Sequence, residues 1–471
     1  MARAAATRDW ALLDQLFKRD FATSSGIFIV MALGVLIVDR LLADSRYAHR
    51  VLPFWQMAGL IVFVLSNQLI GGLAAHLRSY RREPFMAPLV VSTVVTLPLI
   101  FWAAAHYSSA GLVAVLASVN LLLNLPIAIF ALPLLTIAIP TFTRANYLEL
   151  NLQRLVEEAR ALPPSVLEVI VSDNCSTDTT PDVVTKAVSQ GLSIRYIRNK
   201  IDIGSDANIA QCFNEARGHY VQIMGDDDMY VRGMLSYLIG HLQQAEYGIV
   251  CLRPFGYETD PEQEYPGEDG PVERYDRVGD FLAAVGSYIT FISACIINKR
   301  AQEDIDARQF CGSNLVQVHL VVNAALQVRH NAYMKRYMLA CKRANSGGYD
   351  FSEVFVERLG RILDSYRPVG LTAKDIDQFE TRMLKSYHPF NLVRQRLARQ
   401  GDLRETHRRF AARFGLRPLF VLWVAPIIHW PRPLALAWGM MATIIGRISN
   451  GDLRRGAHFA LNKLRRHRQA D

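Results

Sequence analysis

The stretch YVQIMGDDD at residues 220–228 decides the fold, because it joins an apolar run to three consecutive aspartates. Residues 220–224 predict a short buried strand, and Asp226, Asp227 and Asp228 follow at its carboxyl end. Neighbouring like charges repel, and a divalent cation removes that repulsion. Mg²⁺ and Mn²⁺ prefer carboxylate oxygens, and Mg²⁺ commonly takes one or two carboxylates plus substrate phosphates. The stretch therefore favours a metal–diphosphate site, with a solvated acidic turn as the alternative.

Strands and helices alternate between residue 134 and the aspartates. Apolar runs bounded by turn residues predict buried strands, and segments with helical spacing of leucine and valine predict helices. The predicted strands are 134–140, 167–172, 193–197 and 220–224, and the predicted helices are 147–162, 182–190 and 206–217. This alternation is typical of an α/β domain with a parallel sheet.

Polar residues follow three of these strands, at the edge where an open α/β sheet binds its ligand. Thr141 follows the first strand, Asp173 the second, and the triplet 226–228 the fourth. A nucleotide across this edge could place its base near Thr141, its ribose or base on Asp173, and its diphosphate and metal on the triplet. No GxxxxGK(S/T) motif occurs, which excludes a P-loop, and the missing GxGxxG after the first strand argues against a dinucleotide fold.

Composition points to several domains and an anionic partner. The chain has 471 residues, too many for one core, and its net charge is +9. A phospholipid surface, nucleic acid or a phosphorylated substrate would suit that charge. The six cysteines show no CxxC spacing, which argues against zinc and a disulfide framework and favours a reducing compartment.

The first third of the chain predicts a four-span transmembrane domain over residues 1–132. Each of four apolar stretches is close to the roughly 20 residues that a helix needs to cross a bilayer. They cover 21–38, 57–77, 86–105 and 111–131. A buried soluble helical bundle is the alternative.

Short basic loops predict the orientation of these spans. Lys18 and Arg19 precede the first span, and Arg78, Arg81 and Arg82 separate the second from the third. Because cytoplasmic loops carry an excess of Lys and Arg, the amino terminus and everything after the fourth span are expected in the cytoplasm.

The carboxyl-terminal region, 366–471, predicts helices followed by a basic tail. Prolines divide its apolar part, 416–448, into pieces at 419–428 and 434–445 that are short for spanning, so interfacial or re-entrant helices are expected. The tryptophans suited to the headgroup level are Trp423, Trp430 and Trp438, and the cations that follow are Arg447, Arg454, Arg455, Lys463, Arg465, Arg466 and Arg468. Anionic membrane lipid is the expected partner here, and no nucleic-acid recognition module accompanies the charge.

Four ordered motifs make residues 134 to about 250 resemble the nucleotide-sugar-binding half of a GT-A glycosyltransferase of family 2. They are IAIPTFTR at 137–144, VSDNCSTD at 171–178, the segment 199–208, and RGHY at 217–220 leading to GDDD at 225–228. The GDDD form is most similar to the abequosyltransferase-like subgroup of bacterial surface polysaccharide synthesis, and residues 286–364 resemble that subgroup more loosely. The resemblance implies an α/β GT-A domain, Rossmann-like with a mostly parallel sheet, over 133–365, beside the α-helical transmembrane domain.

The resemblance also implies a nucleotide-sugar site and a metal site. Asp173 would contact the nucleoside, and Asp227 and Asp228 would bind Mg²⁺ or Mn²⁺ and the diphosphate. The family often has an aspartate where Gly225 stands, and the expected order of metal ligation is Asp228, Asp227, then Asp226. The residues expected at the nucleotide-sugar are Pro140, Thr141, Thr143, Arg144, Asp173, Asn174, Asp206, Asp226, Asp227, Lys342 and Arg343.

The resemblance implies that transfer inverts the configuration at the sugar's anomeric carbon. Such a reaction requires a base that removes the proton of the acceptor hydroxyl. His319 falls near the position from which relatives supply that group, and its ordinary pKa of about 6.5 suits the task. A structural helix histidine is the alternative reading. Glu303, Asp304 and Asp306 are the other candidates.

These features together predict a metal-dependent inverting glycosyltransferase of the hexosyltransferase type in the bacterial inner membrane. Its expected acceptor is a polyprenyl-phosphate- or polyprenyl-diphosphate-linked molecule at the cytoplasmic face. A processive polysaccharide synthase is an alternative, although the Gln-x-x-Arg-Trp motif of such enzymes is missing. A non-enzymatic scaffold with a degenerate transferase domain is another. Homo-oligomerisation through the membrane domain is a further expectation.

Overall fold

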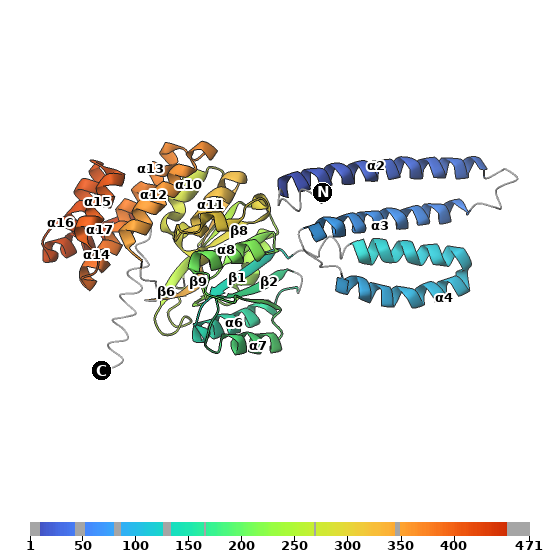
Figure 1. Cartoon of the computed structure of the whole chain (residues 1–471), viewed down its shortest axis with the longest axis horizontal. Coiled ribbons are helices and arrows are strands. Elements are labelled where there is room, and N and C mark those ends of the chain that lie inside the picture. Colours follow the sequence, from blue (N-terminus) through green and yellow to red (C-terminus); the bar gives the residue numbers. More distant parts are fainter. Residues whose placement is uncertain are drawn as a thin grey trace. The chain divides into compact units, whose positions relative to one another are not determined.

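The computed structural model describes residues 10–42, 52–79, 86–125, 133–163, 166–267, 270–343 and 349–449. The chain divides after Pro133 into two compact units, Met1–Pro133 and Leu134–Asp471. Figure 1 draws both units with their helices and strands labelled.

The first unit consists of long apolar helices. They are α2 (Trp10–Leu42), α3 (Phe54–Ser79) and α4 (Met86–Val119), which continues into a π-helical turn, η2 (Asn120–Asn124). Their large apolar side chains mostly face outward, as those of Leu41, Trp55 and Phe101 do. Three stretches, Ala22–Leu42, Phe54–Gly72 and Thr96–Asn124, are long and apolar enough to cross a membrane.

Helix α4 breaks at Ser108, whose φ of 56° and ψ of −142° are not helical. Figure 1 shows the chain turning back on itself within α4. The break lies where the sequence predicts a turn between the third and fourth spans. The structure therefore supports three candidate spans, and the four-span arrangement stays a prediction. Arg81 and Arg82, on which the predicted orientation depends, lie outside the described residues.

The second unit begins with the predicted alternation of strands and helices. The strands are β1 (Leu135–Thr141), β2 (Leu167–Asp173), β3 (Ile194–Arg198) and β4 (Tyr220–Ile223), and the helices are α6 (Ala145–Ala159), α7 (Thr180–Ser189) and α8 (Ser205–Glu215). Each element is confirmed, with ends within three residues of those predicted. The pairs β1–β2, β1–β4 and β2–β3 are all parallel.

Five further strands complete a nine-stranded sheet. They are β5 (Asp228–Tyr230), β6 (Ile249–Tyr257), β7 (Val272–Tyr275), β8 (Cys295–Asn298) and β9 (Asn331–Lys342). The strand order is β3-β2-β1-β4-β8-β6-β9-β5, and β7 pairs with β9. The expected GT-A-like α/β domain is confirmed, and its complete sheet is mixed. β8 and β5 run antiparallel to their neighbours, whereas β6 and β9 are parallel to each other.

Helices cover both faces of this sheet, as Figure 1 shows for α6 and α7 on one face and α8 and α11 on the other. Besides those above, the helices on the sheet are α9 (Met234–Leu242), α10 (Val278–Val285) and α11 (Val316–Gln327), and short 3₁₀ turns lie at η3 (Gly286–Thr290), η4 (Ile292–Ala294), η5 (Arg300–Gln302) and η6 (Ala307–Phe310). One core joins the sheet to α6, α7 and α9, and a second joins it to α8, α10 and α11.

The chain then forms a helical region, in which most buried residues up to Met383 belong to the second core of the sheet and the later helices have a core of their own. Its elements are η7 (Glu353–Arg358), α12 (Leu359–Ser365), η8 (Arg367–Val369), α13 (Ala373–Arg382), η9 (Met383–Tyr387), α14 (His388–Ala398), α15 (Leu403–Phe414), η10 (Phe420–Val424), α16 (Ala425–His429) and α17 (Arg432–Ser449). Leu392, Phe410, Phe420, Val424 and Ile427 are buried together in this region. The first apolar piece predicted to meet the membrane, 419–428, is thus largely internal.

Helix α17 packs on this core through its small residues. A Cβ added at Gly439 would lie 2.4 Å from Cγ2 of Val393 in α14. Because that neighbour is a stiff, buried side chain, the glycine is required for the close approach of the two helices.

We expect Gly439→Val to lower the free energy of unfolding of the helical region by about 1–3 kcal/mol, the usual cost of overpacking a core. Ala437→Val on the exposed face of the same helix is the matched control, since it carries the same β-branched side chain. Urea denaturation followed by tryptophan fluorescence measures both. Equal effects of the two substitutions would contradict the packing role of Gly439.

Candidate functional site

The three aspartates after β4 are tied to the loop after β1. Thr141 donates a hydrogen bond to Oδ2 of Asp226 at 2.8 Å. The guanidinium of Arg144 bridges the first two carboxylates, with Nη1 3.1 Å from Asp226 and Nη2 3.0 Å from Asp227. Because β1 and β4 are parallel neighbours, their carboxyl ends bring these four side chains together. The structure thus places the predicted residues Thr141, Arg144, Asp226 and Asp227 in one cluster.

Asp228 is buried beside a residue that the sequence did not single out. The hydroxyl of Ser293 in η4 donates to the Asp228 carboxylate and accepts the backbone N–H of Gly225 at 2.8 Å. Asn151 of α6 donates to the backbone carbonyls of Gly225 and Asp228, at 3.1 and 2.6 Å. Ser293 and Asn151 therefore fix the turn that carries the aspartates. No sequence pattern reveals Ser293, since it approaches from 65 residues away.

Burial changes the acidity of two of these carboxyl groups. It raises the pKa of Asp228 to about 7, and the neighbouring Asp227 carboxylate adds to the rise. Burial also raises the pKa of Asp226 to about 6, although the Arg144 guanidinium opposes the shift. A buried carboxyl group whose charge lacks full compensation gains from a cation placed beside it.

Two of the carboxylates converge next to Gly225. A Cβ built on this glycine would lie 3.0 Å from Oδ1 of Asp227 and 3.0 Å from Oδ2 of Asp228. The glycine therefore leaves room between two acidic oxygens, and any side chain there would compete with whatever those oxygens bind.

The donor chemistry of this cluster fits Mg²⁺ or Mn²⁺. Among the described residues, no group of three or more His, Cys, Asp or Glu side chains is placed to hold a metal ion by itself. Two converging carboxylates are, however, what Mg²⁺ takes when substrate phosphates supply further ligands. Asp227 and Asp228 are accordingly the residues that fit the ion, and their ligation of it stays a prediction.

The loops after β1 and β2 lie side by side at the same edge. Thr141 is in register with Asp173, and Pro140 with the residue before it. The backbone N–H of Thr143 donates to the Ser176 hydroxyl at 2.8 Å. Thr143 adopts a left-handed φ of 53°, which turns the chain back toward the second loop. The predicted residues Pro140 and Thr143 thus lie where the first loop meets the second, and their contact with a nucleotide-sugar stays a prediction.

The carboxylate of Asp173 is fully buried and already has partners. Oδ1 accepts the backbone N–H of Ser176 at 2.8 Å, and Oδ2 accepts the hydroxyl of Tyr196. Nε of Arg198 lies 3.6 Å from Oδ2, and half of the Arg198 side chain is exposed. Tyr196 and Arg198 are further residues of this site that sequence reasoning missed. The contact of Asp173 with a nucleoside stays a prediction.

Asn174 and Asp206 order neighbouring loops. The Asn174 side chain donates to Asp202 and accepts the backbone N–H of Ile203 at 3.0 Å. The Asp206 carboxylate accepts two backbone N–H groups, at 2.8 and 2.9 Å, from the loop 312–314. Both predicted residues therefore make structural contacts, and their contact with a nucleotide-sugar stays a prediction.

Two predicted cations lie at the carboxyl end of β9, the strand that pairs with β5 beside the triplet: Lys342 and Arg343. β9 runs antiparallel to β5 directly beside Asp228, and Lys342 is its last residue. The Lys342 ammonium donates to the backbone carbonyl of Glu258, and Nη1 of Arg343 lies 3.6 Å from the Glu258 carboxylate. Residues 344–346, which follow directly, lie outside the described residues. The chain order thus brings two cations to the same end of the sheet as the aspartates.

His319 lies in α11 among aromatic partners. Its ring stacks on Phe310 with centroids 4.3 Å apart, and the Tyr366 hydroxyl donates to its backbone carbonyl at 3.0 Å. Burial lowers the pKa of His319 to about 4. Asp306, one of the alternative bases, accepts the side-chain amide of Asn214 and the backbone N–H of Arg308. The base role of His319 stays a prediction, and its described partners are those of a packing residue.

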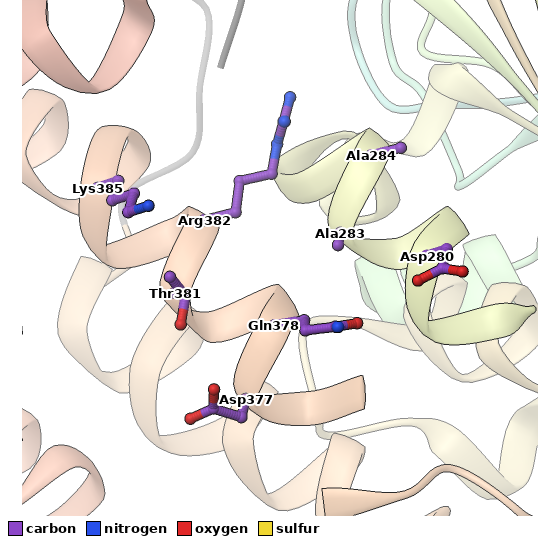
Figure 2. A pocket seen from close by; sticks show the side chains of 8 residues that line it. All are labelled: Asp280, Ala283, Ala284, Asp377, Gln378, Thr381, Arg382 and Lys385. Atoms are coloured by element: carbon purple, nitrogen blue, oxygen red, sulfur yellow. The ribbon is translucent and has the colours of Figure 1, made fainter. Parts of the chain in front are cut away.

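A separate open pocket of about 600 Å³ lies between α10 and α13. Figure 2 shows its lining, in which Asp280, Ala283 and Ala284 come from α10, Asp377, Gln378, Thr381 and Arg382 from α13, and Lys385 from η9. None of the predicted site residues lines this pocket. The candidate site is therefore the cluster at the carboxyl ends of β1, β2 and β4.

We expect Gly225→Ala to weaken Mn²⁺ binding by at least about tenfold, because the methyl group would occupy the space between two carboxylate ligands. Gly240→Ala in α9 is the control, since a Cβ there meets nothing within 4 Å. Electron paramagnetic resonance of free Mn²⁺ in titrations with each purified protein measures the affinity. Unchanged affinity in Gly225→Ala would contradict the assignment of Asp227 and Asp228.

Comparison with known proteins agrees with this geometry. The family model described as Glycosyl transferase family 2 matches residues 136–301. The abequosyltransferase RfbV of Salmonella typhimurium is 25% identical over 185 residues, which cover 37% of this chain and 55% of that protein. The GalNAc(5)-diNAcBac-PP-undecaprenol beta-1,3-glucosyltransferase of Campylobacter jejuni is 28% identical over 182 residues, covering 37% of this chain and 56% of that protein.

The chain thus matches only about half the length of these relatives. Among solved structures, S. aureus TarS in complex with UDP-GlcNAc aligns at 15% identity and a TM-score of 0.47, covering 67% of this chain and 92% of that one. The matched segment of this chain contains β1 to β4, both loops and the triplet. Residues 136–301 are therefore a glycosyl transferase family 2 domain.

Proposed function

We propose that this protein transfers a sugar from a nucleotide-sugar donor to a lipid-linked acceptor, with inversion at the anomeric carbon. The observation that carries the proposal is the convergence of Asp227 and Asp228 beside Gly225, within a family 2 domain. Such a pair at the carboxyl ends of parallel strands suits a diphosphate bound with a cation.

The side chains around the triplet suit the departure of a diphosphate. Arg144 bridges Asp226 and Asp227, and Lys342 lies at the end of the adjoining strand. Positive groups held in place at developing negative charge stabilise the transition state without reorganising. Mg²⁺ or Mn²⁺ held by Asp227 and Asp228 would supply further neutralisation of the diphosphate. Thr141 and Ser293 keep the carboxylates in position.

The loop after β2 is the proposed nucleoside side of the site. The buried Asp173 carboxylate accepts the Tyr196 hydroxyl, and the half-exposed Arg198 guanidinium lies beside this pair. Such an arrangement offers hydrogen-bonding groups at the edge of the sheet, next to Thr141. The nucleoside would thus bind at the end of β2, with β1 between it and the diphosphate at the end of β4.

A polyprenyl-phosphate- or diphosphate-linked molecule is the proposed acceptor. Two features support it: three stretches of the described residues suit membrane spans, and the Campylobacter jejuni relative is named for an undecaprenol-linked substrate. Attachment to the membrane would raise the effective concentration of a lipid acceptor at the site. The proposed location is the cytoplasmic face of the bacterial inner membrane, with four spans.

We expect Asp227→Asn and Asp228→Asn each to reduce donor turnover by about 100-fold or more, because neutral amides are poor ligands for a hard cation beside a diphosphate. Asp182→Asn, at an exposed position in α7, is the matched control and should retain the parent rate. The assay follows release of nucleoside diphosphate from UDP- and GDP-sugars with a polyprenyl-diphosphate-linked saccharide, with Mn²⁺ or Mg²⁺ and with EDTA. Full activity in both triplet variants would refute the metal site.

The products of the same assay separate the remaining functions. Mass spectrometry should show the acceptor extended by a single sugar. A ladder of long products would indicate a processive synthase, and no turnover with any donor in the parent protein would favour a scaffold.

The base role of His319 predicts a fall in kcat of roughly 10²–10⁴-fold for His319→Gln, with little change in the donor KM. It also predicts a fall in the parent rate as pH decreases through about 4, because protonation of the ring would remove the base. Rate measurements between pH 3 and 8 on both proteins provide the test. A fall near pH 4 that is present in the parent and missing in the variant identifies the ring, because the triplet carboxyl groups titrate in both proteins. A variant rate within about tenfold of the parent rate would assign His319 to packing against Phe310 and Tyr366.

A further inference from the structure

Helix α17 has two faces of opposite character. Small residues on one face, including Ala435, Gly439 and Ala442, are buried against the helical region. Large apolar residues lie on the other face: Leu434, Met440, Met441, Ile444, Ile445 and Ile448 are all exposed, with 58% exposure at Leu434 and 53% at Ile444. At 100° per residue these six fall within an arc of about 140°. An apolar arc of this width on the outside of a protein calls for an apolar partner.

Helix α14 extends the same apolar surface. α14 and α17 run antiparallel, since Gly439 meets Val393 while Gly446 meets Lys385 just before α14. Phe390 and Leu397 of α14 are exposed as well. We call these two residues and the six of α17 the α14–α17 face.

Cations border this face and acids are missing from both helices that form it. Arg394 and Arg447 place their guanidinium groups 5.9 and 4.9 Å from the ring centroid of the exposed Phe390. Arg432 donates to the backbone carbonyls of Arg396 and Leu397 at the carboxyl end of α14. Neither 388–398 nor 432–449 contains an aspartate or glutamate. The border of the face is therefore complementary to an anionic surface.

We propose that the α14–α17 face docks on an anionic lipid bilayer, with α17 lying in the plane of the interface. Helix α17 is not suited to cross the bilayer, because the face opposite its apolar arc packs against α14 and η9. Only the outer arc, and not the whole helix circumference, is available to lipid. Trp430, 42% exposed at the amino end of α17, suits the headgroup level.

The proposed lipid contact involves fewer residues than the sequence predicts. Trp423 and Trp438 use their indole N–H groups inside the protein, donating to the carbonyls of Lys385 and Trp423. Within residues 419–428, Phe420, Val424, Ile427 and Ile428 are buried in the core of the helical region, whereas Val421 and Leu422 are exposed. The proposed lipid contact is the longer exposed face of α17 with the edge of α14, and α17 ends where the basic sequence 450–471 begins.

A lipid bilayer suits this face better than a second copy of the chain. Self-association through the face would bring the arginines around Phe390 toward those of the other copy, and no acid on either helix would compensate them. Anionic headgroups supply that compensation. The proposal stands apart from the transfer activity, since it uses no residue of the candidate site.

The test places photoreactive p-benzoylphenylalanine at Ile444 in the full-length protein, reconstituted in vesicles of phosphatidylglycerol and phosphatidylethanolamine. Arg408, exposed on α15 of the same helical region, is the matched control position. After irradiation, mass spectrometry of the peptides identifies what the probe has captured. We expect phospholipid adducts at position 444 on the order of tenfold above those at position 408, with fewer in phosphatidylcholine vesicles.

A second variant checks that the face itself causes the contact. With the probe moved to Met441, Ile444→Glu together with Ile448→Glu should reduce the lipid adduct severalfold, because both glutamates would face anionic headgroups. These side chains are exposed, so the fold should be retained, which size-exclusion chromatography and circular dichroism verify. Donor turnover in detergent should equal that of the parent protein.

Three results would overturn the proposal. Adducts between two copies of the chain at position 444 would make the face a self-association surface. Adducts with residues 10–125 of the same chain would make it an internal contact. Equal lipid adducts at positions 444 and 408 would show that the face has no preferred contact with the bilayer. Each of these results leaves the proposed transfer reaction untouched, because donor turnover is measured separately.

Discussion

Three adjacent carboxylates follow a buried strand, and the site depends on how the protein stabilises them there. Asp226 and Asp228 are buried, so each carboxyl group needs a partner that offsets the lost hydration. Arg144 and Thr141 supply partners from the loop after β1, and Ser293 supplies one from the second half of the sheet. Removing any of these three partners would leave a buried carboxyl group with less compensation for the charge of the neighbouring aspartates.

This constraint links the two halves of the sheet. The parallel strands β1 to β4 bring the loops of Thr141, Asp173 and Asp226 to one edge. The later strands β8 and β9 run beside β4 and β5 and carry Ser293, Cys341 and Lys342 to the same place. The later half of the mixed sheet thus places partners beside Asp228 that the four parallel strands do not carry.

The helical region and the first unit follow a different physical principle, the division of helices into buried and exposed faces. In α17 small residues permit close packing on α14, which leaves the large apolar residues outside. In the first unit the long helices carry apolar side chains on nearly every face, as a helix surrounded by lipid does. Hydropathy along the sequence does not separate these two cases, because it counts residues and not faces.

The sequence by itself determined the alternating α/β pattern, the edge that carries the site and the membership of Thr141, Arg144 and the triplet in it. These depend on local periodicity and on the rule that parallel strands share their carboxyl ends. Only the tertiary structure decided that Ser293, Tyr196 and Arg198 join the site, that Asp206 binds a loop, and that His319 stacks on Phe310. These contacts join residues that are distant in sequence or depend on side-chain direction, and spacing along one chain specifies neither.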